Sequence, residues 1–276
     1  MAVIVMVSAK CSPGVSASLA ALAYAWPRRV LLADCDPAGG DLAAGWLGHW
    51  LFDNRLDTGR GVLSFATDTR HASVGEAALL APHVQQVPVA PHARLLAGLS
   101  GPAQHTSVGD GGWRRVAQAL GDASATGGWD VLIDVGRHSP ATPRPLFAIA
   151  DRVLVGVRPV PRQVVATRPL LPVLSSRVEP GTLAMAAVAS STVGARDVRR
   201  ALGLPVAVEL PHDARTAAVF ADGDRAGEPL SRAPLVVAAR SAAAHLQTTL
   251  NLRPPPAPLD AAPARADVPT PKEMLR

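Results

Sequence analysis

The stretch from residue 7 to residue 18, VSAKCSPGVSAS, contains the residue types with which proteins bind phosphate and Mg²⁺. In a phosphate-binding loop, backbone N–H groups and a helix N-terminus hold the phosphates, a lysine adds positive charge and a Ser or Thr hydroxyl binds Mg²⁺. Aligned to the pattern G-x-x-x-x-G-K-[ST], the stretch keeps Gly14 and Ser16 but carries Val15 where the lysine is expected. The candidate phosphate-binding residues are Lys10, Cys11, Ser12, Pro13, Gly14, Val15, Ser16 and Ala17.

Other positions of the loop also depart from the pattern. Cys11 and Ser12 add Cβ atoms where the backbone of such a loop uses positive φ, and Pro13 removes one N–H group. Lys10 is one of two lysines in the chain, and it can supply the missing charge from the start of the loop. The alternatives are an ordinary surface lysine and a strand–loop–helix turn that binds nothing.

Three aspartates follow apolar runs at points where a parallel sheet would bring them together. Asp34 ends one such run, Asp36 follows it, and Asp134 ends another. The carboxyl ends of parallel strands share one edge of a sheet, where ligands bind. A carboxylate there can bind a water of Mg²⁺, so Asp134 and Ser16 are the candidate metal ligands. Turn chemistry and helix capping, by Asp41 above all, are the alternative interpretation.

Short apolar runs alternate with helical stretches along the chain. This order predicts an α/β fold, with a mostly parallel sheet and helices on both faces. The predicted strands are residues 2–7, 29–34, 129–136, 151–157, 182–190 and 205–211. The predicted helices are residues 16–26, 40–50, 111–123, 161–177, 194–203 and 234–250, the fourth interrupted or kinked by Pro169 and Pro172. Residues 53–112 show only weak periodicity.

The C-terminal end differs from the rest in composition. Residues 252–276 are rich in Pro and Ala and contain few large apolar side chains. Such a segment cannot bury enough apolar surface to fold, so it predicts a disordered tail. The 276-residue chain is then expected to form one domain, residues 1–251, followed by the tail.

Composition narrows the class of protein. No apolar run reaches the roughly 20 residues that span a bilayer, so no transmembrane segment is expected. Two cysteines are too few for a disulfide framework and favour a reducing, cytoplasmic location. No histidine spacing predicts a metal site, and no G-x-S-x-G motif predicts a hydrolase. The formal charge of +5 is carried almost entirely by arginine and permits weak, non-specific DNA binding.

Four stretches, in order, resemble the ParA/MinD family of P-loop proteins. Lys10 stands where the deviant Walker A motif K-G-G-x-G-K-[ST] has its signature lysine. Residues 31–43 resemble the second strand and switch I of that family, and residues 129–140 its Walker B strand. Pro211 and Asp213 resemble its base-proximal loop. The resemblance covers about residues 1 to 250. The continuation Gly40-Asp41-Leu42 is closest to the CpaE/TadZ branch, the pilus-assembly localisation ATPases.

This resemblance implies a P-loop NTPase-like fold that binds ATP and Mg²⁺ between two subunits, with dimerisation as the output. Lys10 would contact phosphate, also in trans, while Asp36 and Asp34 would orient the attacking water. Pro211 and Asp213 would lie near the base. Since Val15 replaces the lysine that stabilises the transition state, the expected enzyme is at best a slow ATPase. Family members position a cargo, such as a pilus or secretion component or a chromosome.

Two other functions remain open at this point. The first is a pseudo-ATPase scaffold that keeps the fold and a partner surface but binds no nucleotide, which Val15, Cys11 and Pro13 favour. The second is a partitioning ATPase that binds DNA non-specifically through arginines, with a steep salt dependence.

Overall fold

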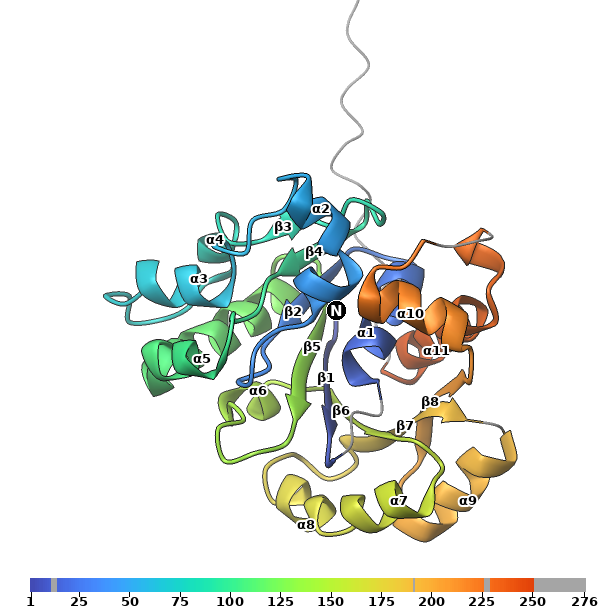
Figure 1. The fold of residues 1–276 in the computed structure, drawn as a ribbon. Helices are drawn as coiled ribbons and strands as arrows, with labels where there is room; N and C mark the ends of the chain where they lie inside the picture. Colours follow the sequence, from blue (N-terminus) through green and yellow to red (C-terminus); the bar gives the residue numbers. More distant parts are fainter. Residues whose placement is uncertain (11–13, 191, 226–228, 251–276) are drawn as a thin grey trace, which may run out of the picture.

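An eight-stranded sheet carries the short apolar runs of the chain (Figure 1). The computed structural model describes residues 1–10, 14–190, 192–225 and 229–250. The strand order is β3-β4-β2-β5-β1-β6-β7-β8, and only the β3–β4 pair is antiparallel. The bounds are β1 Val3–Ser8, β2 Val30–Asp34, β3 Gln85–Gln86, β4 Ala93–Leu96, β5 Asp130–Arg137, β6 Arg152–Val157, β7 Leu183–Ser190 and β8 Val206–Pro211. The predicted fold class is confirmed.

The register of the three central strands places their carboxyl ends at one edge. Asp34 of β2 is level with Asp134 of β5, and Ser8 of β1 is level with Arg137. All six residues of β1 are buried, because helices cover both faces of the sheet and leave no solvent-facing side for polar alternation. The candidate aspartates therefore start from the same edge as the loop after β1.

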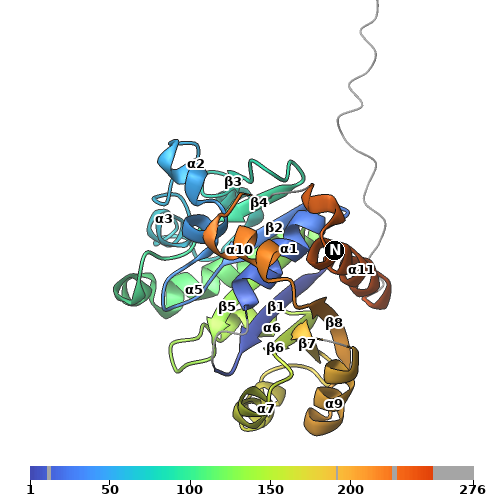
Figure 2. The same ribbon diagram turned by 45° about the vertical axis from the view of Figure 1, so that its right-hand side comes forward.

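Two apolar clusters fill the space between the sheet and its helices. One packs α1 (Val15–Ala25), α10 (Ala214–Asp222) and α11 (Pro234–Thr249) on one face. The other packs α3 (Val62–Asp68), α5 (Pro102–Ala125) and α9 (Thr192–Leu202) on the opposite face. Figure 2 shows α1 and α10 in front of the central strands. The remaining helical segments are η1 Leu42–Trp46, α2 Gly48–Phe52, α4 Ala77–Leu80, α6 Pro145–Ala148, α7 Pro161–Thr167, α8 Leu170–Ser175 and η2 Leu230–Arg232.

Several predicted helices differ in extent from the observed ones. The helix predicted for residues 40–50 is divided into the π-helix η1 and the short helix α2. The helix predicted for residues 161–177 is divided into α7 and α8, with Pro169 as the N-cap of α8. Pro172 lies in the first turn of α8, where an N–H group has no acceptor within the helix and a proline is tolerated.

Two predicted features fall outside the described residues. These are Cys11, Ser12 and Pro13 of the loop, and the tail, residues 252–276. Within the described parts of the chain, no helix is both long enough and apolar enough to cross a membrane.

Candidate functional site

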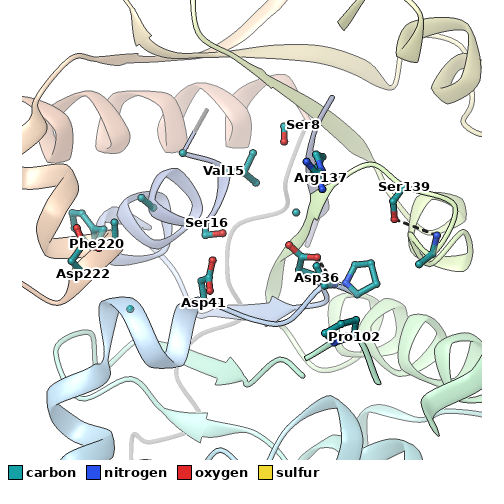
Figure 3. A pocket seen from close by; sticks show the side chains of 18 residues that line it. Ser8, Val15, Ser16, Asp36, Asp41, Pro102, Arg137, Ser139, Phe220 and Asp222 are labelled. Atoms are coloured by element: carbon teal, nitrogen blue, oxygen red, sulfur yellow. Dashed lines mark hydrogen bonds between the residues drawn. The ribbon is translucent and has the colours of Figure 1, made fainter. Parts of the chain in front are cut away.

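A cleft of about 780 Å³ opens at the carboxyl edge of the central strands. Figure 3 shows Ser16 and Asp41 on one side of it, with Asp36 and Arg137 on the other. Its walls come from the start of α1, the ends of β2 and β5, η1 and the end of α10. The lining residues are Ser8, Gly14, Val15, Ser16, Ala17, Asp36, Pro37, Ala38, Asp41, Gly45, Pro102, Gly136, Arg137, Ser139, Ala141, Phe220, Ala221 and Asp222.

The N-terminus of α1 forms one wall of the cleft. Gly14, its N-cap residue, has a left-handed backbone with φ 95° and no side chain that could accept hydrogen bonds from the first amides. The first turn contains no acidic residue. The N–H groups at the start of a helix lack intrahelical acceptors and carry the positive end of its dipole, so this wall suits an anion. Gly14, Ser16 and Ala17 thus lie where the sequence predicted them.

The cation expected at the start of α1 is absent from this position. The Val15 side chain belongs to the apolar cluster on the α11 face of the sheet and is only 5% exposed. Lys10 is exposed and does not line the cleft. Among the described lining residues, Arg137 at the end of β5 is the one basic side chain. The sequence pattern gave Arg137 no role.

Asp134 is buried and is not itself a lining residue, but Ser16 and Gly136, with which its carboxylate interacts, both line the cleft. Half of this carboxylate is unsatisfied. Oδ1 accepts a hydrogen bond of 2.7 Å from the Gly136 N–H, whereas Oδ2 has no partner. Burial raises the pKa of this carboxyl group to about 6, while the Ser16 hydroxyl and the Gly136 N–H act in the opposite direction. The Ser16 hydroxyl therefore lies near the carboxylate without satisfying Oδ2. A buried acceptor without a donor costs stability unless a ligand or water completes it.

Asp34 lies next to Asp134 on the neighbouring parallel strand and is equally buried. Its Oδ2 accepts a 3.0 Å hydrogen bond from the Leu42 N–H, and its Oδ1 has no partner. Burial, and next the charge of Asp134, raise the pKa of Asp34 well above its ordinary value. A Cβ on Gly40 or Gly98 would overlap this carboxylate, so the two glycines enclose it. Like Asp134, Asp34 is not among the lining residues, and its role in orienting a water stays a prediction.

Asp36 does line the cleft. Its Oδ1 accepts a 2.8 Å hydrogen bond from the Ala38 N–H. Burial raises the pKa of Asp36, and the positive charge of Arg137 counteracts part of that shift. Gly136 has a φ of 59°, and a Cβ there would overlap the Asp36 carboxylate. The left-handed turn at Gly136 thus lets β5 end in close contact with Asp36.

The wall opposite β5 was only partly predicted. Asp41 stands at the N-cap position of η1, but its side chain makes no cap hydrogen bond, so the capping interpretation is not supported; the residue lines the cleft. The end of α10 contributes Phe220, Ala221 and Asp222, which sequence reasoning missed. A capping signal was available, because Asp213 precedes the helix and Gly223, with φ 70°, ends it.

Pro211 and Asp213 do not lie in the lining of the cleft. The Asp213 carboxylate accepts hydrogen bonds from the Thr216 and Leu235 N–H groups, at 3.1 and 3.3 Å, and so joins the starts of α10 and α11. Pro211 borders a separate groove between β8 and α11. The carboxylate is thus used as a helix cap, and the placement of this pair beside a bound base stays a prediction.

No preformed metal cluster exists among the described residues. No three His, Cys, Asp or Glu side chains there are grouped so that they could hold a metal ion. Oδ2 of Asp134 and the Ser16 hydroxyl are hard oxygen donors beside an anion-binding helix terminus. Mg²⁺ prefers such donors and commonly completes its coordination with waters and phosphate oxygens. These residues therefore fit a Mg²⁺ that arrives together with a phosphate ligand.

Comparison with known proteins supports the fold assignment. No family model and no curated protein matches the sequence. Among solved structures, the chain is similar to a ParA family ATPase from Chlorobium tepidum TLS, with 16% identity, a TM-score of 0.69, and coverage of 88% of this chain and 99% of that one. It is also similar to the MinD cell division protein of Aquifex aeolicus, with 16% identity, a TM-score of 0.66, and coverage of 90% and 98%.

A third similar structure contains a ligand. It is the septum site-determining protein MinD of Pyrococcus horikoshii OT3 complexed with Mg-ADP, with 12% identity, a TM-score of 0.60, and coverage of 90% of this chain and 96% of that one. The chain therefore has a ParA/MinD-like fold, as its four motifs predicted.

Proposed function

We propose that this protein is a cytoplasmic, nucleotide-dependent dimeric switch of the ParA/MinD type, which binds ATP and Mg²⁺ and hydrolyses ATP slowly or not at all. Its output is the positioning of a cargo, such as a pilus or secretion component or a chromosome. The CpaE/TadZ-like sequence around Asp41 favours the pilus or secretion cargo. The ParA/MinD-like fold and the similar MinD structure with Mg-ADP support the nucleotide.

The observation that carries this proposal is the unsatisfied Oδ2 of buried Asp134, next to the Ser16 hydroxyl and the start of α1. Buried carboxylates in native proteins usually have their acceptors filled. Asp34 also keeps one acceptor unfilled, but the Ser16 hydroxyl interacts with Asp134. An open acceptor, a nearby hydroxyl and an uncapped helix N-terminus together match a phosphate with its Mg²⁺.

The chain's own residues take the following roles. The amides at the start of α1 bind phosphate oxygens, while Ser16 and Asp134 hold Mg²⁺, which when bound neutralises phosphate charge. Asp36 lines the cleft, and in this proposal it orients a water. Lys10 is exposed and lies two residues after the end of β1. In this proposal it contacts phosphate in the partner subunit. Slow turnover follows from Val15, which supplies no charge for the transition state.

Calorimetric titration with ATP and Mg²⁺ tests this proposal. Ser16→Ala removes the hydroxyl beside Asp134, and Ser176→Ala, at the end of α8, is a matched control outside the cleft. We expect the wild-type protein and Ser176→Ala to bind with the same affinity and Ser16→Ala to lose Mg²⁺-dependent affinity. Lys10→Ala is expected to bind but to fail in ATP-induced dimerisation, measured by sedimentation. No wild-type binding at millimolar ATP would contradict the proposal.

The second candidate is an interaction scaffold without nucleotide, and the electrostatics of the cleft favour it. Three acids, Asp36, Asp41 and Asp222, line the cleft against the single arginine. This balance disfavours a nucleotide that arrives without Mg²⁺. Melting curves with ATP alone and with ATP and Mg²⁺ discriminate the two candidates. The melting temperature of a scaffold would rise neither with ATP alone nor with ATP and Mg²⁺. That of a switch would rise only with ATP and Mg²⁺ together.

Non-specific DNA binding is a further candidate. Helix α9 presents three exposed arginines, Arg196, Arg199 and Arg200. DNA binding through phosphate contacts predicts an affinity that falls steeply with salt. Fluorescence anisotropy with a random duplex at two salt concentrations tests it, and salt-independent or absent binding excludes it.

A further inference from the structure

We infer that Arg137 is the phosphate-binding cation of this cleft and that it replaces the lysine that phosphate-binding loops carry where Val15 stands. The inference rests on the proposed nucleotide binding and assigns one residue within it. Its basis is the placement of Arg137, its lack of an ion-pair partner and the burial of Val15.

The backbone of Arg137 is fixed against the strand that leads into the phosphate-binding loop. Arg137 is level with Ser8 across the β1–β5 pair, and the His138 N–H donates to the Ser8 carbonyl at 2.8 Å. Gly136, with φ 59°, turns the chain immediately before it. Figure 3 shows the result, with Arg137 lining the cleft across from Val15 and Ser16. The guanidinium is thus carried by a rigid strand end rather than by a free loop.

The charge of Arg137 is available to a ligand. Its side chain is exposed, and none of the ion pairs among the described residues involves it. The Asp36 carboxylate, with which its charge interacts, forms no ion pair with it and accepts a hydrogen bond from the Ala38 N–H. A guanidinium keeps its charge at all physiological pH values and binds two phosphate oxygens at once. Arg137 is therefore suited to hold a phosphate chain whose other side rests on the start of α1.

Val15 shows why a cation is needed elsewhere. Its side chain is almost fully buried in the cluster that joins α1 to α11. A lysine at this position would extend from the first residue of α1 toward the phosphates. With valine, the position contributes packing and no charge. In the described part of the cleft wall the positive charge is therefore on β5, at Arg137, and not at the start of α1.

Calorimetry with ATP and with AMP, both with Mg²⁺, tests this assignment. The variants are Arg137→Ala, Arg137→Lys and, as a matched control, Arg144→Ala, an exposed arginine at the N-cap of α6. Loss of a charged hydrogen bond weakens binding about tenfold to hundredfold. We expect that loss for ATP with Arg137→Ala, a smaller loss with Arg137→Lys, and none with Arg144→Ala. AMP lacks the outer phosphates, so we expect the affinity for AMP to fall much less in Arg137→Ala than the affinity for ATP.

A second variant separates binding from folding. Val15→Lys added to Arg137→Ala returns a cation to the other wall and is expected to restore ATP affinity, which repair of the fold alone would not do. Melting curves without ligand check that each variant folds. If the wild-type protein binds ATP and Arg137→Ala binds equally well, the assignment of Arg137 is wrong and nucleotide binding stands. If the wild-type protein binds no nucleotide, both proposals fall.

Discussion

Strand β5 has a buried aspartate near each end, and the two carboxylates differ greatly in how many hydrogen bonds they accept. At the amino end, the Asp130 carboxylate accepts from the Ala2 N–H and the Trp26 Nε1–H, and pairs with the Arg28 guanidinium at 2.8 Å. At the carboxyl end, Asp134 accepts from one N–H group and keeps Oδ2 free. At the amino edge all the hydrogen-bonding groups of the aspartate are thus used within the fold, whereas at the carboxyl edge one oxygen has no donor; in the proposed function a ligand completes it.

The largest effect is expected at the amino edge. Asp130→Asn removes the charge that pairs with Arg28, which is itself mostly buried. Breaking a buried pair from one side costs about 3–5 kcal/mol, so we expect a loss of that size in the free energy of unfolding. Urea unfolding at pH 7 measures it. A loss below about 1 kcal/mol would show that the amino edge is not the structural end of the strand.

A pair of glycines gives the next comparison. Gly128 precedes Asp130 and Gly136 follows Asp134, with φ of 72° and 59°. A Cβ at Gly128 meets nothing within 4 Å, whereas one at Gly136 would overlap Asp36. We expect Gly128→Ala to cost about 1 kcal/mol through backbone strain and Gly136→Ala about 2 kcal/mol more through overpacking. Equal losses in thermal unfolding would contradict the close contact at the cleft.

The same change to asparagine at Asp134 should raise the free energy of unfolding, whereas at Asp130 it should lower it. A carboxyl group with its pKa raised from 3.8 to about 6 destabilises the folded protein above that pH. Asp134→Asn removes this cost, and we expect the ligand-free protein to gain about 2 kcal/mol at pH 7. Urea unfolding without nucleotide measures the gain. A loss of stability would show that the carboxylate is structural after all.

The pH dependence follows from the same shift. Because folded Asp134 and Asp34 bind protons more tightly than the unfolded chain does, their contribution to stability is present below the unfolded pKa of 3.8. It is lost as the pH rises through the folded pKa, which is about 6 for Asp134. The stability difference between Asp134→Asn and the wild-type protein should therefore grow between pH 4 and pH 6. A difference independent of pH would exclude this cause.

The smallest change in the free energy of unfolding is again expected at the amino edge of the sheet. The Arg29 guanidinium lies 4.1 Å from the centre of the Trp129 ring. Such exposed cation–π contacts contribute about 0.5–1 kcal/mol, so Arg29→Ala should cost no more than that and leave nucleotide affinity unchanged. Calorimetry and urea unfolding of the same sample check both. A change in affinity would show that the two edges are coupled.

The central strands could be predicted because each is a short, wholly apolar run. Residues 129–136 and the observed β5 differ by one position at each end. The region 53–112 could not be predicted, because its elements are held by tertiary contacts rather than by periodicity. The start of α5, for example, includes Gly109 with a non-helical backbone. Hydrophobic periodicity in a sequence predicts regular helices and strands well, but it does not predict local interruptions of this kind.

The sequence located the acidic residues of the candidate site and the start of its helix. It located the residues that form the other walls of the cleft less well. Asp36, Asp134 and Ser16 could be placed because strand ends meet at one edge. The enclosure of the Asp34 carboxylate could not be predicted, because it depends on Gly40 and Gly98 approaching it from separate segments. No sequence pattern encodes such a contact between distant residues.

The most direct test of the cleft's function is the stability gained with ATP and Mg²⁺. A ligand at about 100 times its Kd adds roughly 2.7 kcal/mol to the free energy of unfolding. We predict a gain of this kind for the wild-type protein in urea at pH 7, and little or none for Asp134→Asn, although that variant starts from higher stability. An equal gain in both proteins, or none in the wild type, would contradict the conclusion that the unsatisfied edge of β5 is completed by a nucleotide with its metal.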